Sequence, residues 1–178
     1  MKKEIVNTNP HILHFILKRH KYFPNSKHPV LIYQEALTLP KQKNKSAGIV
    51  QQIFLRNGWS NSWRNGIYDF HHYHSTTHEC MAVCMGRATV VIGGPRGKKI
   101  TLKQGDVIIL PAGTGHQCMS ASEDFLCVGA YPQGKDYDMN FGLPAELKKS
   151  LTNIRKLSVP SKDPVFGKEG FLKSYWKK

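Results

Sequence analysis

Three histidines and one glutamate stand at fixed intervals inside two glycine-marked blocks, and no other feature limits the possible folds as strongly. The first block, from Gly66 to Gly86, reads Gly-x5-His-x-His-x4-Glu-x6-Gly, and the second, from Gly105 to His116, reads Gly-x5-Pro-x-Gly-x2-His. The polar positions of the two blocks are His72, His74, Glu79 and His116. Three imidazole nitrogens and one carboxylate oxygen are ligands suited to a divalent transition metal.

The first block predicts a pair of strands. Side chains alternate across a strand, so His72 and His74 share one face. The polar residues 75–77 suit a turn, and a second strand is expected to begin near Glu79. Positions of matching parity on the two strands are expected to line a pocket beside the ligands: Tyr68, Phe70, Met81 and Met85.

The second block predicts an apolar strand between two turns. Gly105 and Asp106 suit the first turn, residues 107–110 the strand, and residues 111–115 a loop that leads His116 into the next strand. Cys118 lies two residues after His116 and therefore on the same face of the strand, so we expect it in the pocket wall. We expect it to be a packed thiol in preference to a metal-bound thiolate. The four cysteines include no Cys-x2-Cys pair, which argues against a zinc knuckle.

These two blocks resemble the paired motifs of the cupin superfamily. The resemblance implies an all-β fold, the double-stranded β-helix or jelly-roll barrel with short flanking helices, and a metal centre at the three histidines and Glu79. The chain departs from the pattern at Ser120, where the family usually carries Asn, and this position should not remove a ligand. Two alternatives stay open, because a strand histidine is often only solvated or hydrogen-bonded, and some cupins keep the barrel without an ion.

Residues 65–76 and 128–132, with flanking stretches at 29–33 and 163–167, resemble a narrower group of small bacterial cupins typified by YjlB. This resemblance implies the same fold and the same metal centre. It implies little about activity, since cupins with this ligand set include dioxygenases, isomerases and decarboxylases as well as sensors and storage proteins.

The rest of the chain is predicted to extend one barrel. We expect a single domain over residues 1–178, with its motif-bearing core at about residues 59–132. The elements expected around the motifs are a strand within residues 10–20, a helix over residues 46–57 capped by Ser46, a loop over residues 59–66 whose two tryptophans pack on the barrel wall, and a helix over residues 144–157.

The net charge of +14 suggests nucleic-acid binding, but its distribution argues against a specific site. Residues 46–140 contain eight basic and seven acidic residues, and the flanks contain eighteen and five. Diffuse lysines on terminal segments indicate a solvated surface, whereas a nucleic-acid site concentrates charge on one face. No apolar run reaches the length of a membrane span, and residues 1–6 lack the apolar region of a signal peptide, so we expect a cytoplasmic protein.

The ligand set predicts one divalent ion per chain and does not distinguish Fe, Mn, Ni, Co and Zn. The favoured function is a metal-dependent enzyme, dioxygenase-like or an isomerase, acting on a small chelating molecule. A non-enzymatic protein that senses a metabolite or the metal is the alternative. We also expect a homodimer, because residues 12–17 offer apolar surface at a sheet edge.

Overall fold

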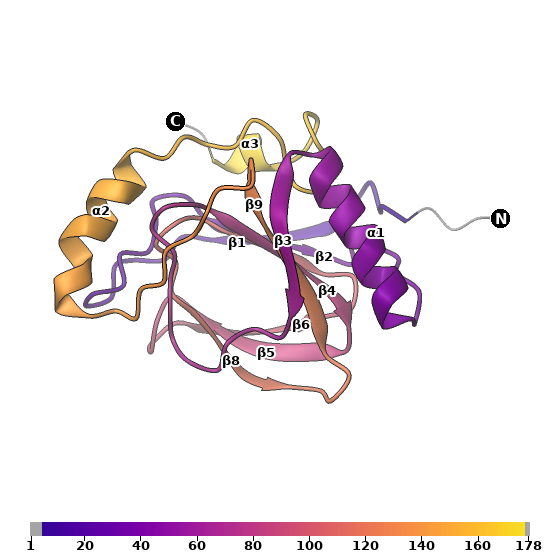
Figure 1. Ribbon diagram of the computed structural model, residues 1–178, viewed down its shortest axis with the longest axis horizontal. Coiled ribbons are helices and arrows are strands. Elements are labelled where there is room, and N and C mark those ends of the chain that lie inside the picture. Colours follow the sequence, from indigo (N-terminus) through magenta and orange to yellow (C-terminus); the bar gives the residue numbers. More distant parts are fainter. Residues whose placement is uncertain (1–4, 177–178) are drawn as a thin grey trace.

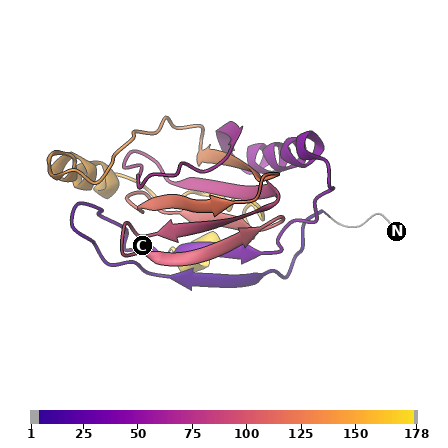
Figure 2. The same cartoon turned by 90° about the horizontal axis from the view of Figure 1, so that it is seen from below.

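Two antiparallel β-sheets packed face to face form the body of the protein (Figures 1 and 2). The computed structural model describes residues 5–176, so most of the N-terminal stretch considered for a signal peptide lies outside the described residues. The strands are β1 (His11–Phe15), β2 (Val30–Gln34), β3 (Trp59–Asn65), β4 (Glu79–Met85), β5 (Arg87–Ile92), β6 (Lys98–Lys103), β7 (Val107–Leu110), β8 (His116–Ala121) and β9 (Leu126–Pro132). The helices are α1 (Lys43–Arg56), the 3-10 turn η1 (Pro144–Glu146), α2 (Leu147–Arg155) and α3 (Leu172–Tyr175).

The strand order is that of a jelly roll. One sheet has six strands in the order β1-β2-β7-β4-β9-β3, and the other has three in the order β6-β5-β8. Several neighbours in the order are far apart in sequence: β2 pairs with β7, and β4 pairs with both β7 and β9. The predicted fold class is confirmed as a mostly β sandwich with short helices around it. Figure 1 places α1 and α2 at opposite ends of the molecule.

Strand β4 separates two apolar cores, because its side chains alternate between the two faces of the sheet. Cys80, Ala82 and Cys84 pack toward α1, where Val50 and Phe54 are fully buried. The opposite face of β4 looks into the space between the sheets, where its apolar side chains meet those of β5, β6 and β8. Burial of one such large side chain stabilises the fold by about 1.5–3 kcal/mol, so these two layers hold the frame on which the polar site is built.

The motif-bearing strands begin where the sequence predicts them. β4 starts at Glu79, β7 covers Val107–Leu110 and β8 starts at His116. Gly105 adopts a positive φ of 93° in the turn before β7, and a Cβ at this position would lie 2.4 Å from the carbonyl oxygen of Leu37. The turn therefore requires glycine on both conformational and steric grounds.

The loop predicted at residues 59–66 is wrong, because this segment is strand β3 at the edge of the six-stranded sheet. Trp59 is buried, while the polar residues that follow it are mostly exposed. The pairing with β9 also shifts between Ser60 and Trp63. Serines and asparagines are typical of turns, and for this reason the composition predicted a loop. On an edge strand with a bulge, however, the same residues can occupy solvent-facing positions.

Two further expectations are corrected. Helix α1 begins at Lys43 with Gln42 as its N-cap, and Ser46 lies inside it, donating its hydroxyl to the Pro40 carbonyl at 2.5 Å. The strand predicted through His72 and His74 is irregular, since its ladder pairing is limited to isolated bridges at His72 and Tyr73 within the described chain. The helix predicted at residues 144–157 is present as η1 followed by α2.

Among residues 5–176, none of the helices has the length and apolar character needed to cross a membrane.

Candidate metal centre

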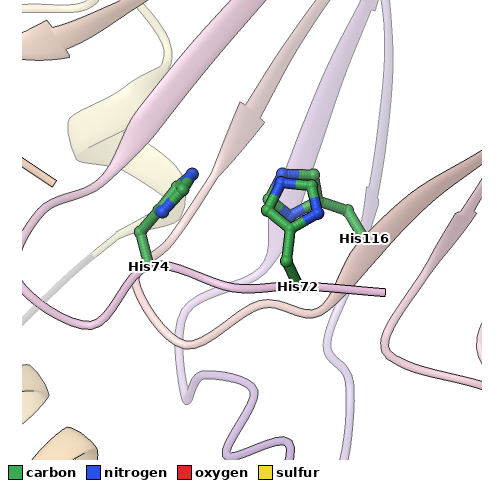
Figure 3. Close-up of side chains that lie close together, drawn as sticks. All are labelled: His72, His74 and His116. Carbon is green, nitrogen blue, oxygen red and sulfur yellow. The ribbon is translucent and has the colours of Figure 1, made fainter. Parts of the chain in front are cut away.

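The three histidines come from two segments that meet between the sheets. His72 and His74 lie on the irregular segment of residues 66–78, and His116 is the first residue of β8. The His72 amide donates to the His116 carbonyl at 3.1 Å, and the His116 amide donates back at 2.9 Å. Figure 3 shows the imidazoles of His72 and His116 side by side, with His74 reaching toward them from the same segment as His72.

The donor atoms of these side chains converge. One ring nitrogen from each of His72, His74 and His116 lies within 4.8 Å of the other two. Glu79 Oε2 lies 3.5 Å from His74 Nε2 and 3.5 Å from His116 Nε2. All four side chains are at most 5% exposed. Donor atoms bound at about 2.0–2.2 Å to a common ion stand about 3.0–3.5 Å apart, so the carboxylate and the two nitrogens have the spacing of ligands.

Backbone hydrogen bonds fix the tautomer of each imidazole. The Nδ1 atoms of His72, His74 and His116 face the carbonyl oxygens of Phe70 (3.0 Å), Asp138 (2.6 Å) and Thr114 (3.0 Å), in that order. A carbonyl oxygen accepts but cannot donate, so each Nδ1 carries a proton, and the neutral form of each ring presents its lone pair at Nε2. The same arrangement orients metal-binding histidines in proteins.

The electrostatics of the cluster favour a cation at its centre. Burial lowers the pKa of His72 to about 4 and holds the pKa of His116 well below its usual value, so both rings are neutral at physiological pH. Burial raises the pKa of Glu79. Its Oε2 is buried and has no hydrogen-bond partner among residues 5–176, although the Nε2 atoms of His74 and His116 stand 3.5 Å away. Facing lone pairs without a proton between them repel, and a divalent ion would satisfy all of them together.

Asp138 holds the loop that carries His74, and no sequence motif indicated this role. Its carbonyl accepts from His74 Nδ1, while its carboxylate accepts from the amides of Ser75 and Thr76 and from the Ser75 hydroxyl. Burial raises the pKa of Asp138, but hydrogen bonds from Ser75 and Asn140 outweigh it and bring the value to about 2. The carboxylate is therefore ionised and holds the turn after His74 in place.

A cavity of about 130 Å³ opens onto the cluster. Its wall includes two of the residues predicted to line it, Tyr68 and Met81. Phe70, Met85 and Cys118 are not part of its lining within the described chain. Phe70 stacks on the outer face of Tyr68 at 4.8 Å and is 38% exposed. The strand alternation that predicted Phe70 in the pocket wall does not apply, because residues 66–71 do not form a strand.

The other two residues are displaced for different reasons. Met85 ends β4 just after a register shift against β9 and lies too far along the strand. Cys118 is buried in the apolar layer between the sheets, and its thiol contacts the Ser120 carbonyl. Ser120 itself is exposed on β8 opposite Thr89, well away from the donor atoms.

Three aromatic residues of the cavity were not predicted. Trp63 on β3, Tyr131 on β9 and Tyr137 in the following loop all line it. Trp63 Nε1 donates to the Tyr131 hydroxyl at 2.9 Å, and Tyr137 stacks on Tyr131 with ring centroids 4.9 Å apart. β9 lies between β4 and β3, and this order brings Trp63 and Tyr131 to the side of Glu79. A loop at residues 59–66 predicts no pairing with β9, so the sequence did not indicate these rings.

Comparison with known proteins agrees with the fold. The cupin domain family matches residues 65–128, a range that contains all four donor residues. The chain belongs to the cupin family. Within it, the chain is 40% identical over 150 residues to the uncharacterized protein YjlB of Bacillus subtilis (strain 168), covering 84% of this chain and 87% of that protein. The resemblance predicted from the motifs is therefore confirmed.

Similarity to solved structures is at the level of the fold. Acireductone dioxygenase from Bacillus anthracis, solved with a cadmium ion in its active centre, is 15% identical, with 71% of this chain and 82% of that chain covered and a TM-score of 0.39. Procruciferin, an 11S globulin from Brassica napus, is 17% identical, with 55% of this chain and 30% of that chain covered and a TM-score of 0.38.

Proposed function

We propose that this cupin is a divalent-metal-dependent enzyme that oxidises a small chelating molecule, with dioxygen as the oxidant. The observation that carries the proposal is the set of three Nε2 lone pairs and one unpartnered carboxylate oxygen at the wall of a cavity. His72, His74, His116 and Glu79 would hold the ion. An ion with four protein ligands and a coordination number of six keeps two positions for substrate atoms and supplies Lewis-acid and redox chemistry there.

The cavity suits a small molecule with an apolar body. Ligand pockets usually enclose about 300–1,000 Å³, so a volume of about 130 Å³ admits only a small substrate or the reacting end of a larger one. The rings of Trp63, Tyr68 and Tyr137, together with Ile67 and Met81, would contact the apolar part. Packing against these side chains would exclude water from the polar end and orient it toward the donor cluster.

The experiment that tests the proposal uses the untagged protein loaded with Fe(II) under anaerobic conditions. Titration with nitric oxide, a dioxygen surrogate, should change the visible and electron paramagnetic resonance spectra, and adding small α-hydroxy and α-keto acids should perturb that signal. Oxygen uptake with a panel of such acids then identifies turnover. If Fe(II) and the acids bind but nitric oxide gives no spectral change, oxidation is excluded, and a lyase, an isomerase or a metabolite sensor replaces it.

A further inference from the structure

A tryptophan and a tyrosine stand in line beside the carboxylate of Glu79. Trp63 comes from β3, Tyr131 from β9 and Glu79 from β4, which are consecutive neighbours in the six-stranded sheet. All three side chains line the same cavity. Tyr131 is 1% exposed, and its ring stands edge-on to His74 at 6.2 Å. Three separate strands therefore deliver these polar groups to one place.

Backbone packing holds the indole in position. Trp63 is paired with Gly129 across the two strands, and its ring covers that glycine so closely that a Cβ there would lie 2.1 Å from the ring. The absence of a side chain at Gly129 is what lets the indole lie flat against β9. In this position Trp63 Nε1 reaches the Tyr131 hydroxyl at 2.9 Å.

The direction of this hydrogen bond determines what the tyrosine does next. An indole N–H can only donate, so the Tyr131 oxygen accepts and its own proton is free to go to another acceptor. The nearest candidate acceptor in the sheet is the Glu79 carboxylate, because β4 and β9 pair Cys80 with Ala130 and so place Glu79 across from Tyr131, and both side chains line the cavity. Oε2 of the same carboxylate has no hydrogen-bond partner among residues 5–176 and stands 3.5 Å from two histidine nitrogens.

We propose that Trp63 and Tyr131 form a relay that orients the Glu79 carboxylate and keeps Oε2 turned toward the histidine nitrogens. This inference rests on the proposed metal centre and adds a positioning residue to it. The relay acts through Glu79 alone, so Tyr131 controls how tightly the ion is held and how symmetrically it is coordinated. Partners that orient a metal ligand are worth about 10–100-fold in metal affinity.

The test compares Tyr131→Phe with a matched control in which another buried tyrosine loses a hydrogen bond to a carboxylate. Tyr33 is fully buried and donates to Asp163 at 2.6 Å in the core beside α1, so Tyr33→Phe removes the same kind of bond away from the cavity. Affinity for Co(II) is measured by competition with a chromophoric chelator, and the visible absorption bands of the Co(II) protein report the coordination geometry. Thermal denaturation shows whether each variant is folded.

Tyr131→Phe should weaken Co(II) binding about 10–100-fold and shift the Co(II) absorption bands, while Tyr33→Phe should lower the melting temperature without changing either. Trp63→Phe, which keeps a ring over Gly129 but lacks the N–H, should weaken binding in the same direction by a smaller factor. In a Glu79→Gln background, Tyr131→Phe should have little additional effect.

Two results would overturn the relay. One is Co(II) affinity and spectra in Tyr131→Phe equal to those of the wild type, and the other is a full effect of Tyr131→Phe that persists in Glu79→Gln. Neither result would contradict the proposed metal centre, because the wild type still binds Co(II). If the wild type itself binds no Co(II), the metal centre fails and the relay fails with it.

Discussion

The four donor residues are held in two different ways. Glu79 and His116 are the first residues of β4 and β8, where ladder pairing with β7 and with β5, respectively, sets their direction. His72 and His74 lie on an irregular segment and depend on hydrogen bonds from their rings to backbone carbonyls. The positions of Glu79 and His116 can therefore be predicted from strand periodicity, whereas those of His72 and His74 depend on residues distant in the sequence.

The largest expected effect comes from removing a donor of the loop-held half. His74→Ala should weaken metal binding by more than about 100-fold, since even the partners that orient a ligand are worth about 10–100-fold. The barrel should still fold, because the two apolar cores do not include this imidazole. Elemental analysis and circular dichroism measure the two outcomes. His71→Ala is the matched control and should retain the metal, as His71 lies outside the cavity lining among the described residues; full occupancy in His74→Ala would disprove the ligand assignment.

A smaller effect is expected from the residue that holds the loop. Asp138→Asn keeps one acceptor oxygen but loses the second, which accepts from the Ser75 hydroxyl and from Asn140. We expect a loss of about 1–3 kcal/mol in the free energy of unfolding and about 10-fold weaker Co(II) binding. Denaturant titration and chelator competition measure these changes. Asp136→Asn, at an exposed neighbouring position, should change neither value, and an Asp138→Asn variant with wild-type affinity would show that the loop holds His74 unaided.

Strand β1 offers a contrast with β4, which carries Glu79 between two neighbouring strands, because β1 is an edge of the six-stranded sheet. Ile16, just after it, is 66% exposed. We predict a homodimer through residues 12–17, so light scattering at tens of micromolar should give twice the chain mass of 20.2 kDa. Ile16→Asp should give the monomer mass with metal affinity unchanged. A monomeric wild type would refute the prediction.

The smallest effect is expected at the position where the chain departs from the cupin pattern. Ser120 is exposed on β8 and is not part of the cavity lining within residues 5–176. Ser120→Asn should alter the free energy of unfolding by no more than about 0.5 kcal/mol and leave metal affinity within error. A clear gain in affinity would mean that the family's asparagine supports the centre in a way that serine does not.

The sequence predicted the strand-held half of the site because period-2 alternation and turn glycines are local signals. The starts of β4 and β8 and the extent of β7 follow from apolar runs bounded by glycine and proline. The same alternation failed at Phe70, because residues 66–71 form no strand and the local backbone turns that ring toward solvent.

Contacts between distant segments could not be predicted in the same way. The Asp138 carboxylate accepts hydrogen bonds from the Ser75 and Thr76 amides, more than 60 residues away in the sequence. No local pattern in either segment predicts this contact. Trp63 and Tyr131 meet only because β3 pairs with β9. The polar composition of residues 59–66 favoured a loop, and the tertiary pairing of the edge strand overrode that local preference.

The most direct test of the central claim is the position of the ion itself. Crystals of the untagged protein grown with Co(II) should show one anomalous peak per chain, located about 2.0–2.2 Å from the Nε2 atoms of His72, His74 and His116 and from Glu79 Oε2. The absence of a peak at this cluster, or a peak bound elsewhere on the chain, would contradict the account.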